Sequence, residues 1–426
     1  MDEKKLLQVL AEQREYVRSL DVSKWVNRRE ESLFELESDL AQVVVGVRRS
    51  GKSTLCHKAL KGAGVDYAYV NMDDDRLFGA KTEDLNKLLS CVYQLYGTEV
   101  KWLFLDEIQN VDGWHLFVNR LLREGMHVFV TGSNAKLLSG ELATHLTGRF
   151  NEIRLFPFSY AEYCAFHSVD LEGLTTKADA ARKTALRGYL LDGGFPELQR
   201  LKNKRAYVQS LLESVVTKDI GRRYGVRNVD ALRDIANHLV NNNCQEVNYT
   251  ALADLFGLGS ANTARKYVFY LKQAFLVSLL PKHSFKSSVR LRNEKSYVVD
   301  VGFLSNRENV LAGENLGWRL ENAVGIELLR RESRNFGDVH YYKPTAQSKE
   351  VDFVVSESGR AIELLQVAYD VASPKTFARE ASALMAASKA LGCDNLTLVT
   401  LGESRDETVQ GKNVRVRSAV DWLLGR

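Results

Sequence analysis

The chain has 426 residues, enough for about three domains, and 45% of its residues are hydrophobic while 26% are charged. This composition is typical of a globular protein and excludes a largely disordered chain, a collagen and a small disulfide-rich fold. The net charge is only +4, but residues 200–299 hold 17 Lys and Arg against 7 Asp and Glu. Such a local surplus of positive charge favours a polyanionic partner, although a solvated basic face without a ligand has the same pattern.

The sequence carries no signal for a membrane helix, for export or for a disulfide framework. No run reaches the roughly 18 apolar residues of a membrane-spanning helix, and the first residues mix acids with bases where a signal peptide is apolar. We therefore expect a cytoplasmic protein without a membrane partner. The cysteines, which are far apart and form no CxxC pair for a zinc site, are Cys56, Cys91, Cys164, Cys244 and Cys393.

Short apolar strands alternate with helices in the first 156 residues. The predicted strands are residues 41–46, 66–71, 102–105, 127–131 and 153–155. Helical periodicity occupies residues 82–96 and 114–123. Because strands that alternate with helices pair in parallel, we expect an α/β sheet covered on both faces.

The pattern changes after Pro157. Amphipathic helices are predicted at residues 159–166, 178–192 and 204–220, and residues 230–275 are predicted to form three helices joined by turns. Short strands follow at residues 277–280, 288–291 and 296–299. An α/β pattern then returns, with a helix at 317–332 and strands at 340–342, 351–355, 361–367 and 396–401.

Residues 46–54 (GVRRSGKST) match the pattern G-x-x-x-x-G-K-[ST] between a predicted buried strand and a helix. Glycines in such a loop let backbone N–H groups point inward at a phosphate, and the following helix adds the positive end of its dipole. Lys52 is expected to reach the β- and γ-phosphates, and Ser53 to ligate Mg²⁺. The predicted nucleotide-binding residues are Gly46, Arg49, Ser50, Gly51, Lys52, Ser53 and Thr54.

A second motif, four apolar residues followed by Asp106 and Glu107, lies about fifty residues downstream. Asp106 at the end of its strand is expected to hold Mg²⁺, directly or through water. Glu107 is expected to polarise the attacking water, so the pair favours hydrolysis of ATP in addition to its binding.

Two more polar positions are candidates for catalysis. The next strand ends in TGSN, where Asn134, in preference to Ser133, is predicted to position water at the γ-phosphate. Arg149 precedes the predicted fifth strand and is a candidate arginine finger for the nucleotide of a neighbouring subunit, with a structural salt bridge as the alternative.

Taken together, these segments resemble the prokaryotic AAA-type P-loop ATPases with a poorly characterised C-terminal region. The matching segments of the first part are GVRRSGKST, VNMDDDRL, LDEIQNVDGW, TGSNAKLLSGEL, LTGR and LFPFSYAEY, and those of the second part are YLLDGGFPE, KDIGRRYGV and EKSYVVDVGF. The resemblance covers almost the whole chain and implies ATP and Mg²⁺ as cofactors.

The resemblance also implies a fold of the α/β class with four parts. They are an AAA-like ATPase core with a parallel P-loop sheet (1–156), a helical lid or linker (157–229), a winged helix-turn-helix (230–305) and a small restriction-endonuclease-like α/β domain (306–426).

The basic middle part is the predicted DNA contact. Its recognition helix begins after Ser260 and carries polar and basic residues that suit base edges and phosphates, and a basic hairpin follows. Winged helices also contact proteins, so a protein partner is the alternative. The candidate DNA-binding residues are Asn262, Thr263, Arg265, Lys266, Lys286 and Arg290.

The C-terminal part is predicted to hold a vestigial nuclease site at Asp352 and Gln366. Nucleases of this fold need an Asp, then a Glu or Gln followed two residues later by a Lys. Aligning Gln366 places Ala368 at the lysine position, and aligning Glu363 places Leu365 there. Nuclease activity is therefore not expected, and a docking or oligomerisation role is favoured.

The sequence as a whole predicts a Mg²⁺-dependent ATP hydrolase that couples hydrolysis to binding or remodelling of DNA as a homo-oligomer. The alternative is a nucleotide-dependent signalling switch that acts on a protein partner through the winged helix. Stimulation of the ATPase rate by DNA distinguishes the two.

Overall fold

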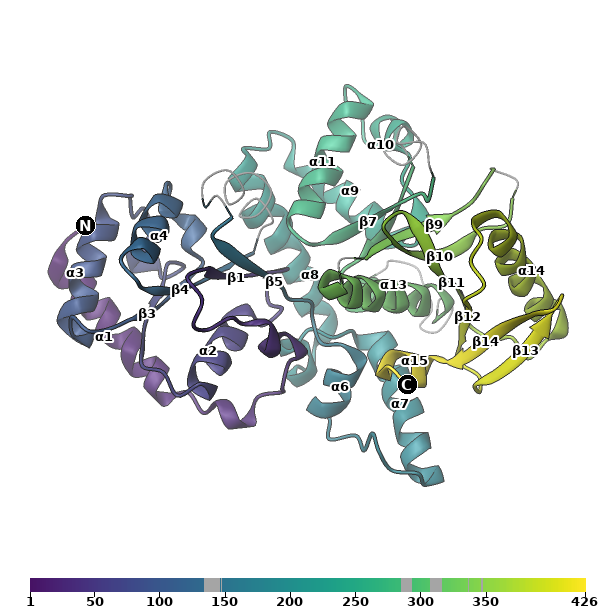
Figure 1. The fold of residues 1–426 in the computed structure, drawn as a ribbon. Helices are drawn as coiled ribbons and strands as arrows, with labels where there is room; N and C mark the ends of the chain where they lie inside the picture. Colours follow the sequence, from purple (N-terminus) through teal and green to yellow (C-terminus); the bar gives the residue numbers. More distant parts are fainter. Residues whose placement is uncertain (134–145, 147, 285–292, 307–315, 336, 346–347) are drawn as a thin grey trace. The chain divides into compact units, whose positions relative to one another are not determined.

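The computed structural model describes residues 1–133, 146, 148–284, 293–306, 316–335, 337–345 and 348–426 (Figure 1). The chain forms two compact units. The first consists of Met1–Phe156 with Gln273–Phe275, and the second of Pro157–Lys272 with Leu276–Arg426. The division of the later residues at 229 and 305 stays a prediction.

The first unit is built on a five-stranded sheet in which every pair of neighbours is parallel, in the order β2-β3-β4-β1-β5. The strands are β1 (Ala41–Val45), β2 (Tyr67–Asn71), β3 (Trp102–Asp106), β4 (His127–Gly132) and β5 (Phe150–Arg154). The β-branched run of β1 is fully buried, as expected for a strand covered on both faces. All five carboxyl ends therefore meet at one edge of the sheet.

Helices lie on both sides of this sheet (Figure 1). They are α1 (Glu3–Ser19), α2 (Lys52–Gly62), α3 (Asp84–Tyr96) and α4 (Trp114–Arg123), with 3₁₀ turns at Val22–Lys24, Arg29–Leu33, Asp75–Leu77 and Ile108–Asn110. Helix α2 packs on β1 and β4 and buries Leu55 and Leu60 against Phe104 and Phe129. Helix α1 covers β2 and α3.

The second unit begins with helices α6 (Tyr160–Phe166), α7 (Thr176–Asp192) and α8 (Lys204–Ser214). Ser159 caps α6 in a capping box with Glu162. The helix predicted to continue to residue 220 instead becomes a π-helix over Val215–Arg222. Four β-branched residues and one glycine weaken the α-helix here, which are Val215, Val216, Thr217, Ile220 and Gly221.

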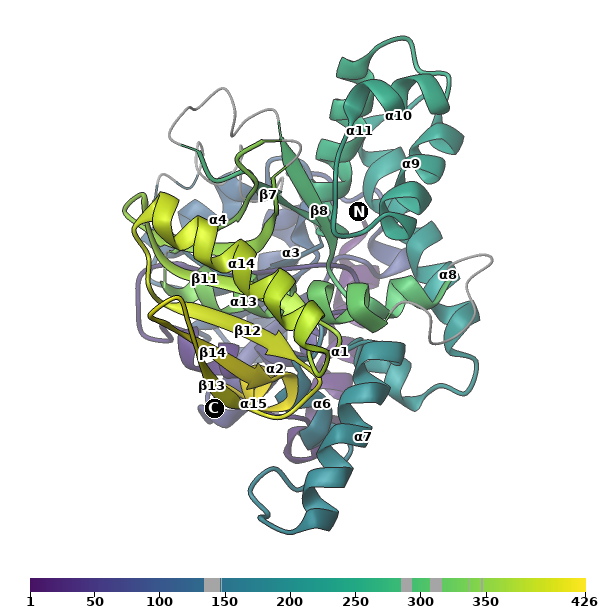
Figure 2. The ribbon, with the colours of Figure 1, turned by 90° about the vertical axis from the view of Figure 1, so that its right-hand side faces the viewer.

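The basic part of this unit contains three helices and a small antiparallel sheet of order β6-β8-β7. In chain order they are α9 (Val229–Asn241), β6 (Gln245–Glu246), α10 (Tyr249–Leu255), α11 (Ala261–Gln273), β7 (Val277–Pro281) and β8 (Glu294–Val298). Figure 2 shows the three helices side by side. The strand predicted at 288–291 lies outside the described residues.

The C-terminal part of the second unit holds a mixed six-stranded sheet of order β13-β14-β12-β11-β10-β9. Its strands are β9 (Asp338–Tyr342), β10 (Val351–Glu357), β11 (Arg360–Ala368), β12 (Leu396–Thr400), β13 (Arg405–Val409) and β14 (Lys412–Ser418). A 3₁₀ turn at Val301–Asn306 and the helices α13 (Leu316–Asn335), α14 (Pro374–Leu391) and α15 (Ala419–Leu424) complete it.

Two helices cover opposite faces of this mixed sheet. Leu384 of α14 packs against Val354 and Leu364 on one face. On the other face the side chain of Phe353 approaches Gly325 of α13 so closely that a Cβ there would lie 3.0 Å from its ring. In the ranges that the structure describes, no helix is both long and apolar enough to cross a bilayer.

Candidate active site

The loop between β1 and α2 (residues 46–51, below called the phosphate loop) has a backbone that requires glycine at two positions. Gly46 has φ +154°, and a Cβ added there would lie 2.1 Å from the carbonyl oxygen of Leu155. Gly51, directly before α2, has φ +98° in the left-handed region. The glycine spacing of the motif thus lets the loop curl against the end of β5 and enter the helix.

Two buried polar groups of the phosphate loop and α2 point to an anionic ligand. The Nζ of Lys52 is buried within the loop, where it donates to the carbonyl oxygens of Gly46 and Val47 at 3.2 Å each. The Ser50 hydroxyl is buried and has no hydrogen-bond partner among the described residues. A buried cation and an unsatisfied hydroxyl at a helix N-terminus fit a phosphate group.

Arg28 lies outside the phosphate loop and forms a hydrogen bond to its backbone. The sequence prediction did not include this residue. Its guanidinium donates to the carbonyl oxygen of Ser50 at 3.3 Å and to that of Phe156 at 2.6 Å. The side chain is buried, so these charge-assisted bonds tie the loop to the segment after β5. No sequence motif marks this arginine, because its contacts with the loop are to backbone atoms.

The metal side of the predicted site is formed by Ser53 and Asp106. The Ser53 hydroxyl donates to Asp106 Oδ1 at 2.9 Å, so the two predicted Mg²⁺ ligands lie together. In the described part of the chain, no three His, Cys, Asp or Glu side chains are grouped to hold a metal by themselves. Mg²⁺ is usually held by one or two protein oxygens together with nucleotide phosphates and water, and Ser53 and Asp106 offer two such oxygens.

Thr131 on β4 connects the two neighbouring acids. Its hydroxyl donates to Asp106 Oδ1 and accepts a hydrogen bond from the backbone N–H of Glu107 at 3.1 Å. Burial raises the pKa of the Asp106 carboxyl and Glu107 raises it further, while hydroxyl donors including Thr131 lower it. The sequence prediction put the polar group of β4 at Asn134, which lies outside the described residues, and missed Thr131.

Glu107 has an unusual backbone conformation for a residue with a side chain. Its φ is +54°, in the left-handed region, which costs energy in a residue other than glycine. Its Oε1 lies 3.9 Å from Lys52 Nζ, and its carboxylate accepts a hydrogen bond from the Gln109 amide. The chain turn after β3 therefore directs this carboxylate toward the phosphate loop.

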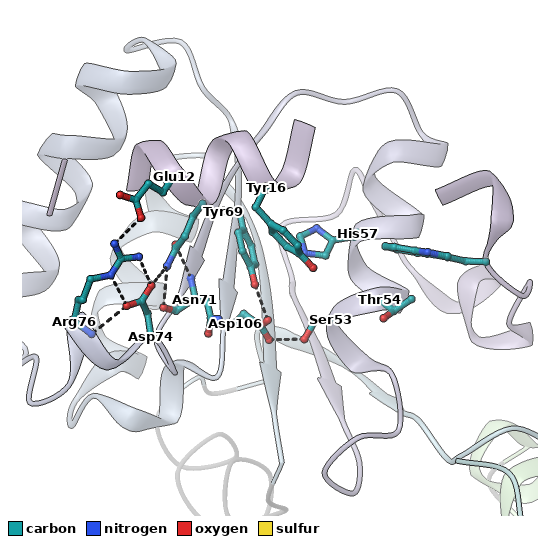
Figure 3. Close-up of a pocket in the computed structure, with 12 residues that line it drawn as sticks. Glu12, Tyr16, Ser53, Thr54, His57, Tyr69, Asn71, Asp74, Arg76 and Asp106 are labelled. Atoms are coloured by element: carbon teal, nitrogen blue, oxygen red, sulfur yellow. Dashed lines mark hydrogen bonds and ion pairs between the residues drawn. The ribbon is translucent and has the colours of Figure 1, made fainter. Parts of the chain in front are cut away.

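A pocket of about 480 Å³ opens beside Ser53 and Asp106 (Figure 3). Thr54, the last predicted nucleotide-binding residue, is exposed and lines it, whereas Arg49 lies in the phosphate loop with φ +68°. The full lining consists of Glu12, Gln13, Tyr16, Trp25, Ser53, Thr54, His57, Tyr69, Asn71, Asp74, Arg76 and Asp106.

Arg149 lies at the opposite edge of the sheet from the phosphate loop. It is exposed directly before β5, whose first residue Phe150 is paired with Ala41 at the start of β1. The phosphate loop follows the other end of β1, about 15 Å further along a five-residue strand. The structure thus separates Arg149 from the loop of its own chain.

The predicted DNA-binding residues lie on the surface of α11 where they are described. Asn262, Arg265 and Lys266 are exposed and Thr263 is partly buried. The Arg265 guanidinium lies 4.5 Å from the ring of Tyr249. Lys286 and Arg290 lie outside the described residues.

Asp352 and Gln366, the predicted vestigial site, are brought together by β10 and β11. The backbone N–H of Asp352 donates to Gln366 Oε1 at 3.3 Å, and that of Val367 donates to Asp352 Oδ2 at 2.9 Å. Gln366 Nε2 donates to Glu380 Oε2 at 3.0 Å. Burial raises the pKa of Asp352, and Glu321 raises it further.

A buried lysine from another strand interacts electrostatically with Asp352. Lys295 of β8 has a side chain only 4% exposed, and its Nζ lies 2.9 Å from Glu321 Oε1 and 2.5 Å from Glu350 Oε1. The sequence prediction considered β11 alone for a cation and missed Lys295. The two carboxylates bind its ammonium group, so it belongs to a buried ion cluster.

We expect Lys295→Ala to lower the free energy of unfolding by about 3–5 kcal/mol, because it leaves two largely buried carboxylates without their cation. Urea denaturation followed by circular dichroism measures the change. Lys343→Ala is the matched control, since its Nζ lies 3.6 Å from Glu350 but its side chain is 28% exposed, and it should cost less than about 1 kcal/mol. Equal stability of Lys295→Ala and the parent would contradict the assigned role.

Comparison with known proteins places the chain in a family. Residues 38–164 match an AAA domain, and residues 183–312 match a domain of unknown function (DUF8612). The chain is 31% identical to the uncharacterized protein MJ1544 of Methanocaldococcus jannaschii over 385 residues, which cover 88% of this chain and 84% of that protein. It is 30% identical to an uncharacterized protein of Haemophilus influenzae over 426 residues, which cover 95% and 100% of the two chains.

Among solved structures, the Walker-type ATPase PABY2304 of Pyrococcus abyssi aligns with 66% of this chain and 95% of its own, at 17% identity and a TM-score of 0.42. The chain belongs to the protein family of the Methanocaldococcus and Haemophilus relatives, and its residues 38–164 match an AAA domain.

Proposed function

We propose that this protein binds and hydrolyses Mg²⁺-ATP in its first unit and couples hydrolysis to binding or remodelling of DNA as a homo-oligomer. The observation that carries the ATPase part is the convergence of Ser53, Asp106 and Glu107 at the end of β3 beside the buried Lys52. The sharpest test of the whole proposal is the ATPase rate of the full chain with and without DNA.

Each residue of the site has a role in this proposal that its position supports. Lys52 contacts the β- and γ-phosphates, and the phosphate loop supplies its backbone N–H groups and the Ser50 hydroxyl. Ser53 and Asp106 hold Mg²⁺, which neutralises phosphate charge when bound. Glu107 accepts the proton of the attacking water. Thr131 holds Asp106 and Glu107 in position through its hydrogen bonds to the Asp106 carboxylate and the Glu107 backbone N–H.

The order of elements in the basic part supports the DNA proposal. A helix, a short strand, two helices and two antiparallel strands follow one another from Val229 to Val298, an order that supports the proposed winged helix. Exposed Asn262, Arg265 and Lys266 on α11 suit contact with a duplex. We expect DNA to raise the ATPase rate several-fold. An ATPase rate that DNA leaves unchanged would contradict the coupling of hydrolysis to DNA.

The position of Arg149 supports the oligomer. Because it lies at the far edge of the sheet from the phosphate loop of its own chain, an arginine finger at this position would act on a nucleotide bound by another subunit, with a structural salt bridge as the alternative. Light scattering with and without ATP measures the assembly. A strictly monomeric protein that hydrolyses ATP would exclude this role of Arg149.

A signalling switch that acts on a protein partner is the second candidate function. It is favoured by two exposed apolar side chains in the same helix pair, Leu255 of α10 at 62% and Phe269 of α11 at 48% exposure. A switch hydrolyses ATP slowly at a rate that DNA leaves unchanged.

Neutralising the basic residues of α11 and the following segment should weaken DNA binding and make its salt dependence shallower. Each lost phosphate contact lowers the slope of log K against log salt by roughly one. The variant carries alanine at Arg265, Lys266, Lys286 and Arg290. Fluorescence anisotropy with a labelled duplex at several salt concentrations measures affinity and slope together.

The matched control removes the same charge from exposed lysines of the first unit, which are Lys4, Lys5, Lys87 and Lys101. Parental affinity is expected for the control. If both variants lose affinity equally, net charge explains the binding and the recognition helix does not.

We expect the purified protein to leave duplex, single-stranded and branched DNA uncut in Mg²⁺ or Mn²⁺. Strand β11 offers Ala368 or Leu365 where a nuclease of this fold needs lysine, and the ammonium group of Lys295 is bound by Glu321 and Glu350. Gel electrophoresis of the products checks this. Cleavage that persists in Asp394→Ala, an exposed acid elsewhere, but disappears in Asp352→Ala would overturn the expectation.

A further inference from the structure

Strand β2 presents two buried tyrosines to the same face of the sheet, because Tyr67 and Tyr69 are two residues apart. Their hydroxyl groups have different partners. Tyr67 Oη lies 2.8 Å from His57 Nδ1, within the core. Tyr69 Oη donates to Asp106 Oδ2 at 2.9 Å (Figure 3). Only the second of these contacts reaches a residue of the proposed ATPase site.

The ring of Tyr69 is held in place by its neighbours. Its centroid lies 4.7 Å from that of His57 in an edge-on arrangement and 5.1 Å from that of Phe104. Since β2 and β3 pair with Asn71 opposite Asp106, Tyr69 stands two residues back on the adjacent strand. The hydroxyl is therefore directed at Asp106 by packing and register, at little further cost in side-chain entropy.

The two oxygens of Asp106 are held from different directions. Oδ1 accepts from Ser53 on α2 and from Thr131 on β4, whereas Oδ2 accepts from Tyr69 on β2. Donors on both oxygens fix rotation of the carboxylate about its Cβ–Cγ bond. Without the tyrosine hydroxyl, Oδ2 loses a charge-assisted bond in a buried setting and the carboxylate is free to turn.

We propose that Tyr69 is a positioning residue of the Mg²⁺ site, whose hydroxyl orients the Asp106 carboxylate so that Oδ1 stays turned to Ser53. This inference rests on the proposed function. Tyr69, Ser53 and Asp106 line the same pocket, which places the hydroxyl at the metal side of the nucleotide site. Groups that orient a metal ligand typically change metal affinity by 10–100-fold when removed, although they do not touch the metal.

The test is the Mg²⁺ dependence of nucleotide binding by the full chain. A fluorescent ATP analogue is titrated in EDTA, and Mg²⁺ is then titrated into the protein and nucleotide. Tyr69→Phe keeps the ring that packs on His57 and Phe104 and removes only the hydroxyl. We expect its affinity in EDTA to stay within about twofold of the parent, and its Mg²⁺ midpoint to rise about tenfold.

Tyr67→Phe is the matched control, because it removes a buried hydroxyl from the same strand face without touching Asp106. Its Mg²⁺ midpoint is expected to equal that of the parent, and thermal unfolding compares the folding of both variants. An unchanged midpoint in Tyr69→Phe, an equal rise in both variants, or a parallel loss of affinity in EDTA would overturn the proposal. A parent that binds no nucleotide at all would overturn the proposed function as well, so the two failures are distinguishable.

Discussion

Glu107→Gln is expected to lower ATP turnover by about 10²–10⁴-fold, the usual contribution of a general base. Glutamine has nearly the same shape and cannot accept the proton of the attacking water. Affinity for Mg²⁺-ATP should stay within about twofold, because the proposed metal ligands, Ser53 and Asp106, and the proposed phosphate contact, Lys52, are unchanged. Single-turnover hydrolysis and equilibrium binding of a fluorescent ATP analogue measure the two quantities separately.

The control for this variant is Glu124→Gln. Glu124 directly follows α4, and its exposed carboxylate pairs with Arg120. It should hydrolyse ATP at the parental rate. Parental turnover in Glu107→Gln would show that Glu107 is not the general base. Loss of nucleotide binding would indicate that the substitution had changed the strained backbone turn at this residue.

The phosphate loop and the two acids were predictable because their chemistry imposes local patterns. A loop that curls around a phosphate needs glycine at Gly46 and Gly51, and the structure has positive φ at both. Likewise, an apolar strand that ends in Asp106 and Glu107 places two carboxylates at the edge where parallel strands end. In both cases the informative residues are consecutive in the chain.

Thr131 and Tyr69 were not predicted, because their contacts depend on strand order and register. Both act on Asp106 from neighbouring strands of the sheet, 25 and 37 residues away in sequence. A tyrosine in β2 and a threonine in β4 look like ordinary strand residues with high β propensity. Only the pairing of β2 and β4 with β3 brings their hydroxyl groups to one carboxylate.

Lys295 was missed for a related reason. The prediction looked for a cation only on the strand of Gln366 and found none there, whereas the structure brings one from β8, 26 residues before Glu321 and 55 residues before Glu350. By contrast, Glu327 pairs with Arg330 and Arg331 on its own helix. Helical spacing fixes the contacts of Glu327 with its two arginines. No local sequence pattern fixes the contacts of Lys295 with Glu321 and Glu350.

Lys52→Ala should remove ATP binding almost completely. A charge-assisted hydrogen bond contributes about 1.5–3 kcal/mol, so loss of the contacts to two phosphates weakens binding by about 3–6 kcal/mol, or roughly 10²–10⁴-fold. The structure strengthens this expectation, since Lys52 Nζ is buried within the phosphate loop at 3.2 Å from two of its carbonyl oxygens. Isothermal titration calorimetry with ATP and Mg²⁺ measures the affinity.

Lys61→Ala provides the comparison, because this lysine lies on the same helix and its Nζ donates to the carbonyl oxygen of Leu20 at 2.7 Å, away from the loop. It should bind ATP as the parent does. The same loss in both variants would mean that charge on α2, and not contact with the phosphates, governs affinity. Parental affinity in Lys52→Ala would show that the nucleotide does not lie in the phosphate loop. The assignment of the nucleotide site to β1, α2 and β3 would then be wrong as well.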